Sequence, residues 1–287
     1  MIKPVSSLLI TVAMLNGFAV SAETVTKRVD LDGIRHIYLL GTYDLAISQG
    51  SNEFVALTAD SSELNNIEAK VQGSKLVLGR GQRNWTFSLF DDNKAETRSP
   101  RADVKFEVQV NNLRSVSNLG VGSVVLADFN SADGLALSNL GAGLVRINSI
   151  TVDDFELNNL GAGRVSINGL NAESISENST GAGRVDYENI HTDKWAIESS
   201  GSTHSSFSGS NTAKNIEVTL NGAGEVDADA LQTEEAEITI KGVGVVRVNV
   251  SDELDVDING TGKVYYGGSP KIKQKISAMG ELIAIDQ

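Results

Sequence analysis

The sequence contains no cysteine, only 3 prolines, and few aromatic residues, which make up 5% of its 287 positions. Without cysteine the chain has no disulfide framework, no thiolate metal site, no thiol nucleophile and no lipid-modified N-terminal cysteine. With so few aromatic residues, the core must be built mainly from Val, Ile and Leu. Basic residues are also scarce: 24 Lys and Arg face 37 Asp and Glu, giving a net charge of −13. This charge argues against a nucleic-acid-binding protein, which presents a basic face.

Residues 1–22 have the pattern of a secretory signal peptide. Lys3 supplies the positive start, a mostly apolar stretch follows, and Val20-Ser21-Ala22 ends it with small residues suited to peptidase cleavage. An uncleaved membrane anchor is the alternative, but the apolar stretch is interrupted and short for a bilayer span. No later stretch is apolar enough to span a membrane. We therefore expect an exported bacterial protein of the periplasm or cell surface, or a secreted one, with residues 23–287 forming a single domain.

Glycine, in contrast, is abundant, with 28 residues, and much of it belongs to an internal repeat. A Gly-x-Gly motif or a near copy recurs in steps of 18 to 21 residues, with first residues Gly120, Gly141, Gly161, Gly181, Gly201, Gly222, Gly242, Gly260 and Ala278. A period near 20 residues is too short for repeats of paired helices. It is typical of one coil of a β-solenoid.

Alignment on the first glycine of each unit reveals apolar columns. The fourth residue after it is almost always Val, the sixth is apolar or aromatic, and the fifth is mixed. Alternation with a period of two predicts a strand with one buried face. A second strand precedes each glycine, and a shorter apolar column follows nine residues after it, which indicates a third side. The expected fold is all-β, a parallel β-helix (β-solenoid) with coils of about 20 residues, in which Asn118, Asn139 and Asn159 share one column and are placed to form an amide ladder.

The N-terminal part follows the repeat less closely. A first coil is expected to begin at Gly41, because Leu45 and Ile47 occupy the two apolar positions after it. Residues 54–59 and 75–78 are further predicted strands. The polar residues 80–102 interrupt the pattern and are interpreted as a projecting loop inserted into the domain.

Several motifs together resemble a known family. They are Gly41–Gly50 (GTYDLAISQG), the stretch Val104–Asn112, the repeated Gly-Ala-Gly-x-Val units, and the closing Asn259–Pro270 (NGTGKVYYGGSP). With them, the chain resembles the bacterial "putative auto-transporter adhesin, head GIN domain" family over roughly residues 31–285. The resemblance implies a right-handed β-solenoid on an exported protein, and it supplies no catalytic motif to transfer.

One column of acidic residues is the sharpest candidate for chemistry. Glu217, Glu237 and Asp255 occupy the same position in consecutive coils, and Lys273 follows them. Like charges stacked about one strand spacing apart repel each other, which invites either a bound Ca²⁺ ion or plain solvation helped by the lysine. A solvated acidic face is the favoured interpretation of the two, and His36, His191 and His204 have no spacing typical of metal ligands.

Glu177 and Ser205 break columns that are otherwise apolar. Glu177 either points inward, where burial would raise the pKa of its carboxyl, or escapes to solvent through a β-bulge. The weak apolar pattern around Gly201–Ser210 favours the bulge and predicts a distorted rung there.

These observations predict a non-catalytic, exported adhesin-like or cell-envelope binding or scaffold protein without a cofactor. A polysaccharide-binding or polysaccharide-degrading β-helix protein is the alternative. Degradation would require a tuned acid pair in a cleft, and acids on a flat sheet are not tuned in this way. The expected partner is an envelope or surface ligand, protein or glycan, and the chain itself is a candidate for homo-oligomer formation.

Overall fold

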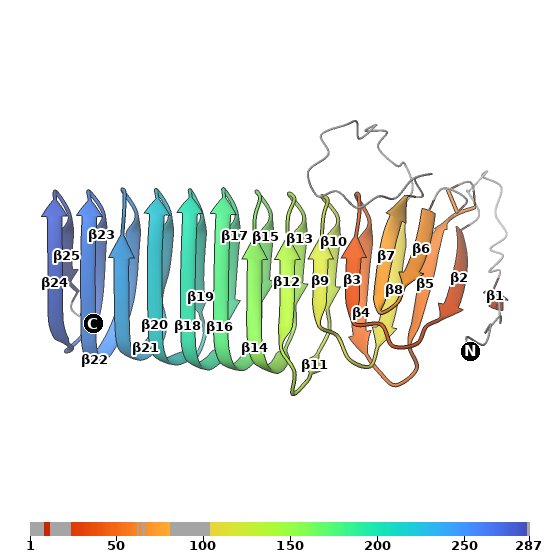
Figure 1. Ribbon diagram of the computed structural model, residues 1–287, viewed down its shortest axis with the longest axis horizontal. Coiled ribbons are helices and arrows are strands. Elements are labelled where there is room, and N and C mark those ends of the chain that lie inside the picture. The colour runs from red at the N-terminus through yellow and green to blue at the C-terminus, as the bar shows by residue number, and fades with distance from the viewer. Residues whose placement is uncertain (1–8, 12–23, 62, 65–66, 81–103, 286–287) are drawn as a thin grey trace.

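The computed structural model describes residues 9–11, 24–61, 63–64, 67–80 and 104–285. Over these residues all regular elements are strands, 25 of them joined in one hydrogen-bonded sheet, and none is a helix. The strands wind into a β-solenoid of about 8 turns with coils of about 20 residues, which confirms the predicted fold class (Figure 1). The predicted loop insertion, and most of the predicted signal peptide, lie outside the described residues.

Two long parallel faces make up the body of the solenoid, and each coil contributes to both. Face A contains β7 (Lys75–Arg80), β3 (His36–Leu39), β9 (Ser115–Asn118), β12 (Leu135–Asn139), β14 (Ile150–Asn159), β16 (Leu170–Gly181), β18 (Ile190–Gly201), β20 (Asn211–Gly222), β21 (Glu225–Ile240), β22 (Val245–Gly260) and β24 (Lys271–Ala278). Face B contains β8 (Lys105–Val110), β4 (Asp44–Gln49), β10 (Ser123–Leu126), β13 (Leu144–Ile147), β15 (Arg164–Ile167), β17 (Arg184–Glu188), β19 (His204–Ser208), parts of β21 and β22, β23 (Lys263–Gly268) and β25 (Glu281–Ala284). The short β11 (Phe129–Asn130) pairs with the start of β14 and begins the third side.

The predicted columns coincide with the observed register. Val124, Val145, Val165 and Val185 are directly paired from coil to coil and fully or almost fully buried. On each strand, the residues next to the valine point outward, so buried and exposed positions alternate as expected for a sheet with one buried face. The core is therefore a continuous stack of like side chains along the solenoid axis.

The repeated glycines are required by close approach of neighbouring coils. A Cβ atom on Gly161 would lie 2.2 Å from the carbonyl oxygen of Gly141, closer than any side chain tolerates. At Gly201 the backbone itself has φ +105°, a conformation that favours glycine. The repeat thus marks the corner at which the chain turns from face A to face B.

A buried ladder of asparagine side chains lies beside the glycine corners of three consecutive coils. Asn118 Nδ2 donates to Gly122 O and to Asn139 Oδ1, both at 3.2 Å. Asn139 Nδ2 donates in the same way to Gly143 O at 3.3 Å and to Asn159 Oδ1 at 3.2 Å. The predicted amide ladder is confirmed, and it ties three coils together inside the core.

The two ends of the solenoid differ. At the N-terminal end, β2 (Thr24–Asp30), β5 (Phe54–Asp60) and β8 pair antiparallel, β6 (Ile67–Gln72) forms a hairpin with β7, and β1 (Leu9–Thr11) adds to β2. The strands predicted at 54–59 and 75–78 are therefore present, and Leu45 pairs with Val124 in the first coil as expected. At the C-terminal end of the described residues, β24 pairs with β22 on one side only, and its Ile272 and Ile276 are 43% and 38% exposed.

Candidate functional site

A groove of ≈ 880 Å³ runs along the solenoid axis. It crosses six consecutive strands of face A, β14, β16, β18, β20, β21 and β22, near the bend at which the third side meets that face. We call it the axial groove. Its lining residues are Thr151, Val152, Asp153, Asn171, Ala172, Glu173, His191, Thr192, Asp193, Thr212, Ala213, Lys214, Gln232, Thr233, Glu234, Asn249 and Ser251.

The floor of the axial groove is a column of small side chains. Val152, Ala172 and Thr192 are paired in register, and Ala213 and Thr233 continue the column. The two threonine hydroxyls already have partners within the protein: the single O–H of Thr192 lies between Glu173 O and Lys194 O, and that of Thr233 lies between Lys214 O and Glu235 O. The hydroxyls of the floor therefore already have hydrogen-bond partners, and a ligand would form its polar contacts mainly with the two walls.

The two walls carry different chemistry. The neutral wall consists of Thr151, Asn171, His191, Thr212, Gln232 and Asn249. These are hydroxyl, amide and imidazole groups, which both donate and accept hydrogen bonds. Within this wall, His191 Nδ1 lies 2.9 Å from Thr212 Oγ1.

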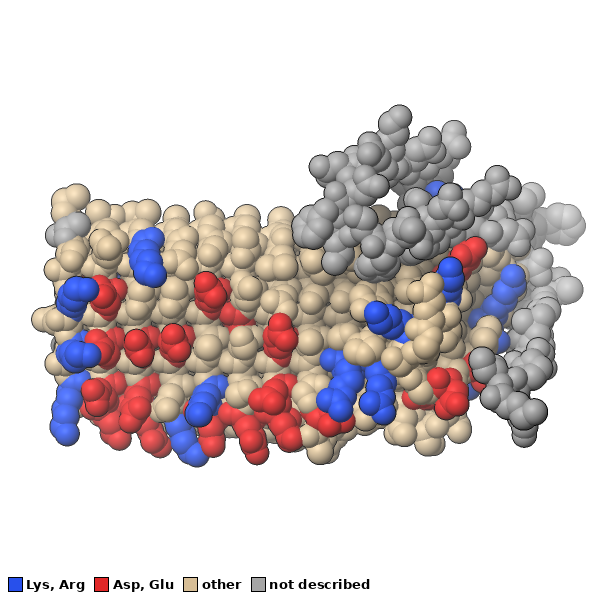
Figure 2. All heavy atoms as spheres, in the orientation of Figure 1, with Lys and Arg blue, Asp and Glu red and all other residues tan. Residues whose placement is uncertain are grey.

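The acidic wall contains Asp153, Glu173, Asp193 and Glu234, with Lys214 among them. Lys214 Nζ forms an ion pair with Asp193 Oδ1 at 2.7 Å. Within the described part of the chain, Asp153, Glu173 and Glu234 form no ion pair, so the wall presents net negative charge. This charge is consistent with the acidic side chains that gather on the C-terminal coils in Figure 2.

The predicted cation residues lie elsewhere on face A. Glu217, Glu237 and Asp255 are paired in register, as the spacing predicted, and we call them the acidic column. Their column ends at Lys273, whose Nζ forms an ion pair with Asp255 Oδ2. Across the described residues, no group of three or more His, Asp or Glu side chains has an arrangement that could hold a metal ion. The solvated face therefore stays the predicted role of the acidic column, with calcium binding as its untested alternative.

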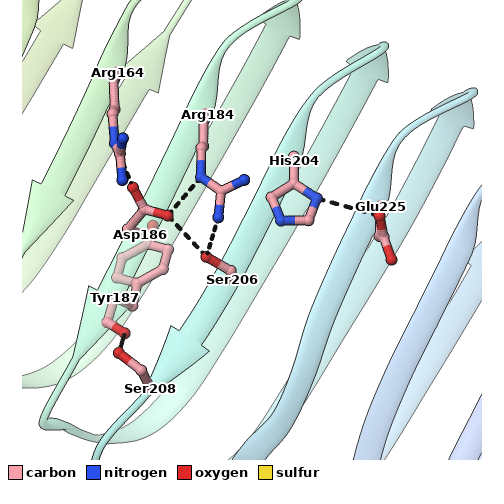
Figure 3. A network of polar contacts seen from close by, with 8 residues as sticks. All are labelled: Arg164, Arg184, Asp186, Tyr187, His204, Ser206, Ser208 and Glu225. Atoms are coloured by element: carbon pink, nitrogen blue, oxygen red, sulfur yellow. Dashed lines mark hydrogen bonds and ion pairs between the residues drawn. The ribbon is translucent and has the colours of Figure 1, made fainter.

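A polar network covers part of face B, and Figure 3 shows its members on β15, β17, β19 and β21. Asp186 accepts hydrogen bonds from Arg164 Nε and Arg184 Nε, each at 2.7 Å, and from Ser206 Oγ at 2.8 Å. Partial burial opposes ionisation of Asp186, but the bonds from Arg184, Ser206 and Arg164 outweigh it and hold the pKa below its ordinary value. The network links neighbouring coils and leaves Asp186 fully engaged, so it is a structural feature.

The histidines do not form a shared site. His36 on β3 contacts Ser115 Oγ through Nδ1 at 2.8 Å, and burial followed by Lys75, Arg35 and Arg114 lowers its pKa. His204 on β19 faces Glu225 Oε2 at 3.3 Å, as Figure 3 shows. His191 lines the axial groove, a role that the sequence analysis did not assign to it.

The preference for a bulge at Glu177 was wrong. Glu177 is 1% exposed and pairs in register with Leu157 and Ile197, without a register shift. Its carboxylate accepts hydrogen bonds from Ser179 Oγ and Ser205 Oγ at 2.7 Å and from Tyr187 Oη at 2.8 Å. These three hydroxyls replace the water that an exposed carboxylate would have, so the strand has no need to bulge.

The same contacts explain the regular rung at β19. Ser205 breaks its apolar column because its hydroxyl is a partner for Glu177, and the predicted distortion is wrong for His204–Ser208, which pair with β17 without a register shift. Burial raises the pKa of Glu177, and the bonds from Ser179, Ser205 and Tyr187 oppose the shift. Shifts of strand register occur instead between β21 and β22, beside Ala228, Gln232, Thr233 and Glu235.

The comparisons with known proteins agree with this fold. The model of the family "Putative auto-transporter adhesin, head GIN domain" matches residues 35–207 and 156–270, and the chain belongs to this family. No curated protein matches. Across the described residues, no helix is long and apolar enough to cross a membrane.

Solved structures with the same fold come from species of Parabacteroides. A "putative lipid binding protein" from Parabacteroides distasonis is 19% identical with a TM-score of 0.62, and the match covers 92% of this chain and 97% of that one. A "putative adhesin" from Parabacteroides merdae is also 19% identical, with a TM-score of 0.58 and coverage of 92% and 96%. At this level of identity the likeness establishes the fold alone.

Sequence reasoning missed the axial groove, although part of its signal was present. Asp153, Glu173, Asp193, Lys214 and Glu234 all lie eight residues before the first glycine of their repeat unit. Aligning that column would have revealed the charged wall. The concavity itself depends on how the chain bends between the third side and face A, and residue types do not encode that bend directly.

Proposed function

We propose that this chain is a non-catalytic, exported, adhesin-like binding protein of the bacterial cell envelope, and that the axial groove is its ligand-binding surface. The observation that carries the proposal is the groove itself, which crosses six consecutive strands and presents polar side chains on both walls. A binding surface that repeats with the coils suits an extended partner, because each coil offers a similar set of contacts.

The positions of the carboxyl groups with raised pKa values support binding rather than hydrolysis. Cleavage of a glycan requires one carboxyl with a raised pKa beside an ionised one in the same cleft. Among the described residues, burial raises the pKa of the Glu177 carboxyl in the core, and burial and then Asp227 raise the pKa of Asp229. Neither belongs to the axial groove, and none of the described residues lining it is a Phe, Tyr or Trp.

The pairing of the strands narrows the mode of recognition. Most residues of the strands that cross the groove are paired with both neighbouring strands, and the carbonyls of Glu173 and Lys214, which lie outside the paired registers, accept hydrogen bonds from Thr192 and Thr233. A partner that lies along the groove is therefore expected to be recognised mainly by side chains. This favours a glycan or the side chains of another protein over a peptide that adds a strand.

A direct test compares groove and column variants of the full chain in binding to glycan arrays and isolated envelope fractions. The groove variant carries Glu173→Lys and Glu234→Lys, and the matched control carries Glu217→Lys and Glu237→Lys in the acidic column. Both sets of positions are exposed, so both variants are expected to fold. We expect the groove variant alone to lose binding; equal binding by the two variants would overturn the proposal.

A further inference from the structure

We infer that the ligand of the axial groove is a linear polymer of amino sugars with free amines, a polycationic and hydroxyl-rich glycan. The inference rests on the proposed function, since it specifies the ligand class of the same groove. It follows from the length of the groove, the difference between its walls, and the pairing of its one lysine.

The length of the groove indicates a polymer. Six consecutive strands line it, and neighbouring strands are spaced by about 4.8 Å, so the groove extends for roughly 24 Å along the axis. A monosaccharide or a single metabolite would occupy a small part of this length. A chain with a short repeat would meet a similar pair of wall residues at each coil.

The acidic wall selects the charge of the polymer. It holds four carboxylates and one lysine, and the lysine is already paired with Asp193. Asp153 and Glu173 lie on adjacent coils, and Glu234 lies beyond Lys214, so ammonium groups along a ligand would find carboxylates at several coils. Charge-assisted hydrogen bonds of this kind are the stronger ones in proteins, and the same wall repels polyanions.

The neutral wall selects for hydroxyl groups on the other edge of the polymer. Asn171, Thr212 and Gln232 both donate and accept hydrogen bonds, as sugar hydroxyls do. A purely cationic chain such as oligolysine carries no hydroxyl groups and offers this wall only its backbone amides and carbonyls. A neutral glycan would leave the carboxylates unpaired, and an amino-sugar polymer satisfies both walls.

The test is calorimetric titration of the full chain with three probes at mildly acidic pH, where sugar amines are protonated. The probes are a glucosamine hexamer, chosen to match the six strands, its fully N-acetylated counterpart, and a lysine hexapeptide. We expect the glucosamine hexamer to bind at least about tenfold more tightly than either of the others. Circular dichroism and melting curves establish that each protein used is folded.

Two matched variants separate groove binding from general attraction to an acidic protein. Glu173→Gln with Glu234→Gln removes two charges from the axial groove, and Glu217→Gln with Glu237→Gln removes two from the acidic column. We expect the first pair to weaken hexamer binding about tenfold and the second to change it less than about twofold. Equal losses in both pairs would show that binding follows net charge and would overturn the inference.

The remaining outcomes distinguish the inference from the proposed function. The acetylated hexamer could bind as tightly as the glucosamine hexamer, with Glu173→Gln and Glu234→Gln weakening the binding of both. The proposed ligand class would then be wrong, while the groove would remain the binding surface. If the lysine hexapeptide binds as tightly as the sugar, recognition depends on charge alone and the inference fails. If none of the three probes binds, the amino-sugar assignment is wrong. The proposed function is still decided by the glycan-array and envelope binding of the variants that carry Lys in place of groove or column carboxylates.

Discussion

Tyr187 Oη donates a hydrogen bond of 2.8 Å to Glu177 Oε2 inside the solenoid, between side chains that come from different faces. Tyr187 is also packed against Trp195, edge to face with ring centroids 4.6 Å apart. The contact joins a polar residue to the aromatic cluster of the core. Glu177 also accepts a hydrogen bond from Ser205, so the two polar residues that break the apolar columns are partners of each other.

The buried carboxyl of Glu177 predicts a specific dependence of stability on pH. Burial raises its folded pKa above the ordinary value of 4.5, so the native state holds this proton more tightly than the unfolded state. The contribution of this group is therefore fully present below pH 4.5 and is lost as the pH rises through the folded pKa. We expect Glu177→Gln to lack this loss, so that the free energy of unfolding of the variant gains on the wild type as pH rises. A difference between the two proteins that stays constant with pH, measured by urea unfolding, would contradict this account.

Replacing Glu177 by an apolar residue is expected to be costly unless its partners are replaced too. Glu177→Leu leaves the hydroxyls of Ser179, Ser205 and Tyr187 buried without their acceptor, at a cost of about 1–3 kcal/mol for each group. The multiple variant Glu177→Leu, Ser179→Ala, Tyr187→Phe and Ser205→Val removes all three hydroxyls and should recover most of that loss. Urea midpoints of the two variants measure the difference, and a single variant as stable as the wild type would show that the hydroxyls do not depend on Glu177.

The register of the stack predicts opposite consequences at adjacent positions. Val165 is fully buried between Val145 and Val185, so Val165→Asp places an unpaired charge in the core and should cost more than about 4 kcal/mol. Arg164 is outward, and Arg164→Ser loses an exposed ion pair with Asp186 worth at most about 1 kcal/mol. Thermal melting measures both, with Val165→Thr as a milder core change if the Asp variant fails to fold. Similar melting temperatures for Val165→Thr and Arg164→Ser would place Val165 outside the core.

The acidic column is expected to behave as a solvated face. Its members are paired from coil to coil, and Lys273 offsets the repulsion at one end. We therefore expect millimolar Ca²⁺ to change the melting temperature no more than Mg²⁺ does at equal ionic strength. A calcium-specific rise that Glu237→Gln abolishes would instead establish a cation site.

Much of the fold follows from the sequence because each coil repeats the same pattern. The Val124, Val145 and Val165 column and the asparagine ladder were both predicted, since stacking places like residues on like. Contacts between different columns were not predictable in this way. Ser205 and Glu177 are 28 residues apart in the sequence and belong to different columns. In the sequence, each is therefore a single polar residue in an apolar column, and only the packing of face A against face B makes them partners.

The axial groove was beyond sequence reasoning for a related reason. The spacing of Asp153, Glu173 and Glu234 indicates one charged row, and alternation alone cannot say whether a row lies on a ridge or in a hollow. The hollow arises where the strands bend over a floor of small residues such as Ala172 and Ala213. Both the bend and the size of the floor residues are properties of neighbouring coils taken together.

The most direct test of the groove as the binding surface is carboxyl footprinting of the full chain with and without the glucosamine hexamer. Carbodiimide coupling labels accessible Asp and Glu side chains, and mass spectrometry reports the labelling of each one. The account predicts that bound hexamer protects Glu173 and Glu234 in the axial groove, and that Glu217 and Glu237 in the acidic column are labelled as before. Equal labelling of Glu173 and Glu234 with and without the hexamer, or equal protection of all four residues, would contradict it.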